Sequence, residues 1–195
     1  IGGELRPILS SKPERQDVAF GNLTNGITGI SRAVMRLTKL EQFYIANAPI
    51  TDEFFVEVAE DSAFYAERDT WSWAEFESLM DVEIYNCAQL TKLPLDLLCG
   101  APKLQSLNLS MNQGIAGKQL LSDWEAIIDG ESGADIQILY FNSCNLEETP
   151  DYSYLSRMTK IGLLDLSNNK LTTIHPFGKE ISPVTLYYDY NRIPN

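Results

Sequence analysis

The pairing in this sequence that most resembles a catalytic nucleophile with its base would join one of three cysteines to the single histidine. A pair formed by Cys144 and His175 is conceivable, but thiolate chemistry needs an exposed, electropositive setting, and Cys144 falls at a position expected to be buried. The sequence contains no Gly-rich phosphate loop, no His-Glu-x-x-His and no Gly-x-Ser-x-Gly. We therefore expect no catalytic residue and no enzymatic activity.

Metal binding would need carboxylates or thiolates at defined spacings. Glu147 and Glu148 are adjacent, as are Asp52 and Glu53, but neither pair lies in the alternate-residue loop of a dedicated calcium site. The cysteines are too far apart in the chain for a local zinc knuckle. We expect no metal ion and no cofactor.

With catalysis and metal binding not expected, any function depends on how the chain positions its polar side chains for binding. Residues 160–174 show the repeated unit that positions them. Leu164 and Leu166 alternate with the period of two of a short strand that buries one face. Asn169 follows where the chain must turn, and Leu171 and Ile174 point inward again from the next arc. A unit this small cannot bury its own apolar face, so it needs stacked copies of itself.

Copies of this unit occur along most of the chain. Their starts fall near residues 40, 79, 104, 136, 161 and 183, which gives spacings of 39, 25, 32, 25 and 22 residues. The short spacings fit repeats of roughly 20–29 residues, and the long ones indicate insertions at about 51–72 and 114–134. We expect a lead-in over residues 1–14, then one repeat domain over 15–195 that begins with a degenerate capping repeat, residues 15–36.

Two helix signals lie in or directly after the insertions. Ser122 and Glu125 have the spacing of a capping box, which predicts a helix that begins at Ser122, continues through Ile128 and ends at Gly130. Apolar residues at inward spacing predict a further helix over residues 71–79.

The ninth position of each unit should form a buried ladder along the stack. Asn suits it because its carboxamide bonds neighbouring backbone, and Cys suits it as a small buried residue with a weak donor. Cys87 and Cys144 lie two repeats apart, at about 10 Å for a strand spacing of about 4.8 Å, which is too far for a disulfide. We expect three free, unreactive thiols. The ladder positions are Ala48, Cys87, Asn112, Cys144, Asn169 and Asn191.

The repeats resemble the leucine-rich repeat family, and residues 37–49, 82–87 and 104–109 are similar to the large cell-surface leucine-rich repeat proteins of gut Bacteroidetes. The resemblance covers the chain from about residue 15. It implies an α/β fold, a right-handed solenoid with a parallel concave sheet of six or seven short strands and an irregular, partly helical convex side. It also implies a modular protein at the cell surface or secreted, with binding rather than catalytic roles.

Residues between the buried leucines should face the concave surface of the sheet. Tyrosines there alternate with acids and amides, and Tyr offers contact area and a hydrogen bond at low entropic cost. We expect this face to bind a protein, peptide or glycan. A structural spacer between neighbouring modules is the alternative, and a targeting domain of a longer enzyme is a third. The predicted ligand-binding residues are Tyr44, Glu83, Tyr85, Asn108, Tyr140, Asp165, Tyr187 and Asp189.

The overall charge of the chain disfavours some classes of binding partner. A formal net charge of -12 disfavours nucleic acid and anionic membrane surfaces, which require Lys and Arg. The sequence contains no run of 18 apolar residues, so we expect no direct insertion of this segment into a membrane. The chain ends at Asn195 inside a repeat, so we expect further repeats, or a partner chain that packs on this end of the stack. The acidic 51–72 insertion is an alternative binding site.

Overall fold

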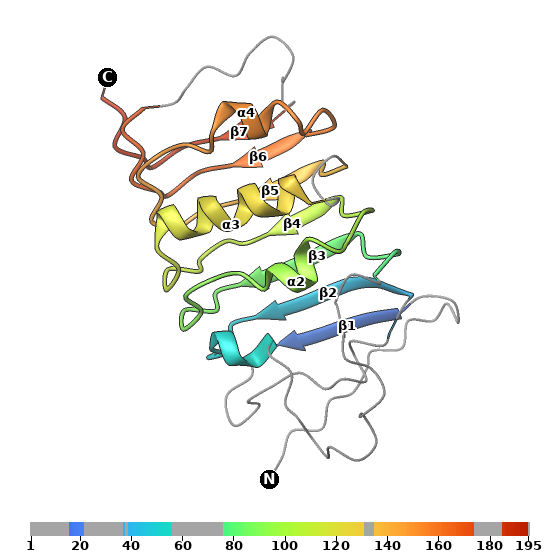
Figure 1. The fold of residues 1–195 in the computed structure, drawn as a ribbon. Coiled ribbons are helices and arrows are strands. Elements are labelled where there is room, and N and C mark those ends of the chain that lie inside the picture. The colour runs from blue at the N-terminus through green and yellow to red at the C-terminus, as the bar shows by residue number, and fades with distance from the viewer. Residues whose placement is uncertain are drawn as a thin grey trace.

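The computed structural model describes residues 16–21, 37, 39–55, 76–130, 135–173 and 185–194. These residues form one sheet of seven parallel strands whose spatial order is their order along the chain (Figure 1). The predicted fold class, an α/β leucine-rich repeat solenoid, is confirmed. The strands are β1 (Gln16–Gly21), β2 (Leu40–Ala46), β3 (Asp81–Tyr85), β4 (Ser106–Asn108), β5 (Ile138–Tyr140), β6 (Leu163–Asp165) and β7 (Thr185–Tyr187).

Each strand has this position because alternate apolar side chains enter one core. In β3, Val82 and Ile84 are buried, whereas Asp81, Glu83 and Tyr85 are only partly buried. Strands β2 to β7 begin at, or two residues after, the predicted repeat starts. The continuous core of the described repeats explains why a chain of such short strands can fold.

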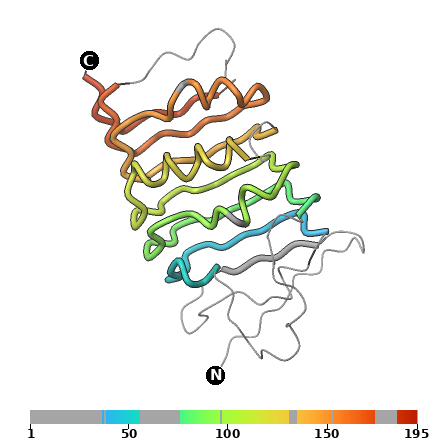
Figure 2. The backbone as a smooth tube through the Cα atoms, in the orientation of Figure 1, coloured from blue at the N-terminus to red at the C-terminus, as the bar shows by residue number. Residues whose placement is uncertain are grey.

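The helical segments lie on one side of this sheet (Figures 1 and 2). The core lies between the helical segments and the sheet. There the ring centroid of Trp124 lies 6.1 Å from that of Phe141 and 6.0 Å from that of Tyr154. We call the opposite side of the sheet the open face; it corresponds to the predicted concave face. The helices are η1 (Asp52–Phe55), α2 (Leu95–Leu98), α3 (Gly117–Asp129) and α4 (Tyr152–Leu155).

Each ladder position follows a residue with left-handed backbone. This conformation aims the ladder side chain back under the strands, and most L-residues adopt it only at a cost. Asn tolerates it best among residues with a side chain, and three of the six residues are Asn. The six residues and their φ angles are Asn47 (52°), Asn86 (52°), Met111 (62°), Ser143 (56°), Asn168 (55°) and Tyr190 (57°).

The predicted start of the 114–134 helix is wrong. Helix α3 begins at Gly117, with Ala116 as its N-cap, so Ser122 lies within the helix and caps nothing. The buried stripe of α3 includes Leu120, which precedes Ser122. Packing of that stripe outweighs a local cap, because most helical stability in proteins comes from tertiary packing. The helix ends before Gly130, as predicted.

The predicted helix over 71–79 is wrong in its described part. Phe76 to Leu79 is a turn in which the Leu79 N–H donates to the Phe76 carbonyl at 3.2 Å. The rest of that helix lies outside the described residues, as do the lead-in 1–14, most of the capping repeat, most of the 51–72 insertion and His175. No helix within the described ranges is long and apolar enough to cross a membrane.

Candidate binding face

Six of the predicted ligand-binding residues form a continuous row across the open face, which we call the central column. Strand pairing places the six residues opposite one another in succession, one from each of β2 to β7. Tyr85 and Asp189 lie outside this row: Tyr85 is the last residue of β3, and Asp189 comes two residues after the end of β7. The row runs Tyr44, Glu83, Asn108, Tyr140, Asp165 and Tyr187.

Side chains of the N-terminal strands are joined in pairs across the face. Gln42 Nε2 donates to Asp81 Oδ2 at 2.9 Å, and these residues are opposite each other on β2 and β3. Asn108 Nδ2 donates to Glu83 Oε2 at 3.2 Å in the same way between β4 and β3. Each carboxylate is therefore oriented by an amide on the neighbouring strand.

The C-terminal strands contain a similar arrangement around Asp165. One carboxylate oxygen of Asp165 accepts from Asn142 Nδ2 at 3.1 Å. The other accepts from the Ser167 N–H at 2.9 Å and from the Ser167 hydroxyl at 2.6 Å. These donors fix the rotamer of Asp165 and leave it partly accessible.

Several residues of the face were not predicted as site residues. Gln42 and Asn142 orient the carboxylates described above, and the Met111 sulfur accepts a hydrogen bond from the Tyr85 hydroxyl at 2.8 Å. Tyr190 is 84% exposed. The repeat positions of Gln42 and Asn142, outward and flanking the column, are the sequence signal that could have identified them.

The buried thiols occupy ladder positions, as predicted. The Cys144 thiol donates to the carbonyls of Leu109 and Asn142, each at 3.3 Å. Burial raises the pKa of Cys144 to about 12 and that of Cys87 to about 11, although nearby backbone N–H groups act in the opposite direction. Raised pKa values suppress the thiolate, so neither residue has the properties of a catalytic nucleophile.

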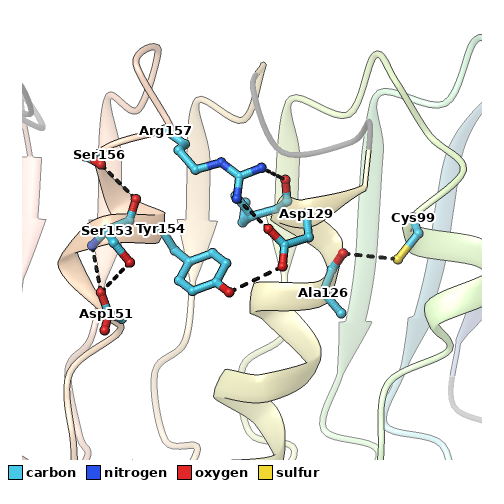
Figure 3. Close-up of polar contacts among 9 residues, drawn as sticks. Cys99, Ala126, Asp129, Asp151, Ser153, Tyr154, Ser156 and Arg157 are labelled. Carbon is cyan, nitrogen blue, oxygen red and sulfur yellow. Dashed lines mark hydrogen bonds and ion pairs between the residues drawn. The ribbon is translucent and has the colours of Figure 1, made fainter.

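The third cysteine belongs to the helix side. The Cys99 thiol donates to the Ala126 carbonyl of α3 at 3.6 Å (Figure 3). In the same view Arg157, which follows α4, forms an ion pair with Asp129 at the end of α3. Arg157 also donates a hydrogen bond to the Ile128 carbonyl at 2.7 Å. A cation at the carboxyl end of a helix is favourable, and we assign this cluster to helix packing.

A cleft of about 570 Å³ lies on the helix side of the molecule, beside α3. Glu125 and Asp151 are among its lining residues, and the pKa of Glu125 is raised by burial and by repulsion from Asp151 and Asp129. Across the described ranges, no three His, Cys, Asp or Glu side chains are grouped to hold a metal ion. The cleft thus offers carboxylates without a metal-binding arrangement.

Comparison with known proteins shows similarity to solved structures. A leucine-rich repeat protein from Bacteroides thetaiotaomicron has 43% sequence identity and a TM-score of 0.77, with 89% of this chain covered. One from Bacteroides eggerthii has 35% identity and a TM-score of 0.72, also over 89% of this chain. An internalin C2 from Listeria monocytogenes, with 18% identity and a TM-score of 0.56 over 93% of this chain and 74% of its own, shares the fold.

This chain spans only 21% and 30% of the lengths of the two Bacteroides proteins. No family model and no curated protein matches it. The parallel sheet, the asparagine and cysteine ladder and the two Bacteroides relatives nevertheless agree on one assignment. The chain is a leucine-rich repeat domain.

Proposed function

We propose that this domain is a non-catalytic recognition module that binds a protein, peptide or glycan through its open face. The observation that carries the proposal is the row of six polar or aromatic residues, one from each of β2 to β7, that strand pairing places side by side across the sheet. Repeat solenoids present such extended faces to partners.

The side chains of this face are also held in place before any ligand arrives. Asp81, Glu83 and Asp165 each accept a hydrogen bond from an amide on a neighbouring strand or the turn after it. Side chains that are already ordered lose less conformational entropy on binding, which favours affinity. Tyr187, 46% exposed, adds a rigid amphipathic surface beside them.

A structural spacer is the second candidate, and the comparisons give it one support. The similar Bacteroides proteins are several times longer than this chain, so such repeats form parts of larger molecules. We propose that the domain lies at a bacterial cell surface or in a secreted protein, which is what the resemblance of its repeats to cell-surface leucine-rich repeat proteins implies. A partner chain or further repeat packed against β7 is compatible with either function.

Panning the 195-residue chain against a random peptide display library and a glycan array tests the proposal. Binders should lose affinity for the Tyr140→Ala/Tyr187→Ala double variant by about tenfold or more, because hot-spot tyrosines are typically worth at least 1.4 kcal/mol. A Lys118→Ala/Glu148→Ala variant removes an exposed pair on the helix side and is the matched control.

Circular dichroism melting of both variants would verify that they fold. Binders that tolerate the tyrosine substitutions, or that are lost equally with the control variant, would contradict recognition by the open face. Absence of any binder in both libraries would favour the spacer function.

A further inference from the structure

We infer that the partner of the open face is an extended peptide segment that carries two cationic side chains four residues apart. This inference rests on the proposed recognition function and names its ligand class. It follows from the placement of charge on the face, from the absence of Lys and Arg from strands β2 to β7, and from the distance between the charged strands.

The charge of the open face is concentrated at two poles. Asp81 and Glu83 lie on β3, and Asp165 and Asp189 lie on β6 and just after β7. The outward positions of β4 and β5, between the poles, are uncharged. They are Ser106, Asn108, Ile138 and Tyr140. No Lys or Arg lies in any of the strands β2 to β7.

The carboxylates at these poles are oriented but not neutralised. The hydrogen bonds to Asp81, Glu83 and Asp165 come from amides, a hydroxyl and a backbone N–H. None of these donors carries a charge, so the poles stay negative. In the described part of the chain, ion pairs lie away from the open face and involve Glu148, Asp129 and Asp135.

The separation of the poles selects an extended segment with spaced cations. Strands β3 and β6 are three strand spacings apart in the sheet, which corresponds to about 14 Å at roughly 4.8 Å per spacing. Four residues of extended chain cover about 13 Å at roughly 3.3 Å each. Cations at positions i and i+4 of a peptide that crosses the strands can therefore reach Glu83 and Asp165 together.

The middle of the face suits the residues between these cations. Ile138 and Tyr140 are both partly accessible, so they offer an apolar edge and an aromatic ring to the intervening side chains. A single metal ion cannot bridge poles about 14 Å apart, since metal–oxygen distances are about 2–2.6 Å. A neutral glycan could donate hydroxyl hydrogen bonds to these carboxylates, but it would bring no positive charge to either pole. The charge pattern thus favours a cationic peptide over both.

The test uses two fluorescein-labelled 12-residue peptides of serine and threonine, each with two arginines. In one peptide the arginines are four residues apart, and in its isomer they are adjacent. Fluorescence anisotropy with the whole chain at about 50 mM NaCl, where surface charges are weakly screened, should give about fivefold tighter binding for the spaced peptide.

Two variants of the chain locate the binding. Glu83→Gln/Asp165→Asn keeps an acceptor oxygen for Asn108 and for Ser167 but removes both charges, and should weaken the spaced peptide about tenfold. Glu147→Gln/Glu148→Gln removes the same charge from exposed positions outside the face and should change affinity less than about twofold.

Equal binding of the two isomers, equal loss with both variants, or no binding of either peptide would overturn the inference. The proposed function has a separate outcome. If display binders depend on Tyr140 and Tyr187 but lack paired cations, the open face is a recognition site and the ligand class inferred here is wrong.

Discussion

The side chain of Asn112 completes the backbone hydrogen bonding of the preceding repeat at Cys87. Asn112 Oδ1 accepts the Cys87 N–H at 2.9 Å, and Asn112 Nδ2 donates to the Leu109 carbonyl at 2.8 Å and to the carbonyl of Ile84. Asn169 binds Cys144 in the same manner. The ladder therefore ties each repeat to the one before it, beneath the strands that bear the open face.

Asn112→Ala should lower the free energy of unfolding by about 2–4 kcal/mol, because it leaves buried backbone groups of two repeats without partners. Urea denaturation followed by circular dichroism measures this change. Gln113→Ala, at an exposed position of the same turn, is the control and should stay within about 0.5 kcal/mol of the wild type. A loss below about 1 kcal/mol for Asn112→Ala would contradict the ladder's role.

The positions of the ladder and of the column could both be predicted by counting residues within each repeat. Asn112, Cys144 and Asn169 recur nine residues into their units, and Tyr140 and Asp165 lie at one fixed offset. Counting succeeds here because stacked repeats convert sequence offset directly into spatial position.

The backbone of the residue before each ladder position offers a route to higher stability. Ser143 has a φ of 56°, and left-handed backbone costs an L-residue about 1–2 kcal/mol. Glycine removes this cost, but it loses more conformational entropy on folding, which destabilises the folded state by about 0.5–1 kcal/mol. Ser143→Gly should thus raise the free energy of unfolding by about 0.5 kcal/mol, measurable by thermal and urea denaturation.

Met111 is the contrasting position for the same substitution. Its φ is 62°, but its sulfur accepts a hydrogen bond from the Tyr85 hydroxyl. Met111→Gly removes that contact on the open face and should not stabilise the protein. Equal destabilisation by Ser143→Gly and Met111→Gly would contradict this prediction, because it would show that the left-handed backbone at residue 143 does not lower the stability of the wild type.

A close approach of backbone at Gly114 predicts a large loss of stability. A Cβ atom there would lie 2.2 Å from the Ala88 carbonyl oxygen and 2.5 Å from that of Leu90. Both atoms belong to the backbone of the adjacent repeat, so Gly114→Ala should cost about 2–4 kcal/mol through displaced repeats. Differential scanning calorimetry would show a lower melting temperature.

Gly162→Ala is the matched control for this substitution. A Cβ atom at Gly162 would meet its nearest neighbour, the Gln137 carbonyl oxygen, at an ordinary 3.7 Å. Its melting temperature should stay within about 2 °C of the wild type. Equal effects at the two glycines would show that the close contact at Gly114 does not constrain the stack.

The details that sequence could not supply all depend on contacts between distant residues. The pairing of Asn108 with Glu83 joins residues 25 positions apart, and that of Gln42 with Asp81 joins residues 39 apart. Helix α3 begins at Gly117, where a Cβ atom would lie 3.0 Å from the Asn145 carbonyl oxygen of the next repeat, and its buried stripe begins with Leu120. The Ser122 capping box is a local signal, and local signals do not report such contacts.

The buried thiols predict how stability changes at alkaline pH. Burial raises the pKa of Cys87 to about 11 and of Cys144 to about 12 from an ordinary value of 9.0. The folded state therefore holds these protons more tightly than the unfolded state. The contribution of the two thiols to the free energy of unfolding is complete below about pH 9 and is lost as pH rises toward 11 and 12. Urea denaturation should show falling stability between pH 9 and pH 11.

Other groups also titrate between pH 9 and pH 11, so the Cys87→Ala/Cys144→Ala variant is the comparison and should show a flatter profile of stability against pH. Parallel profiles for the two proteins would mean that the ladder thiols do not contribute to this pH dependence.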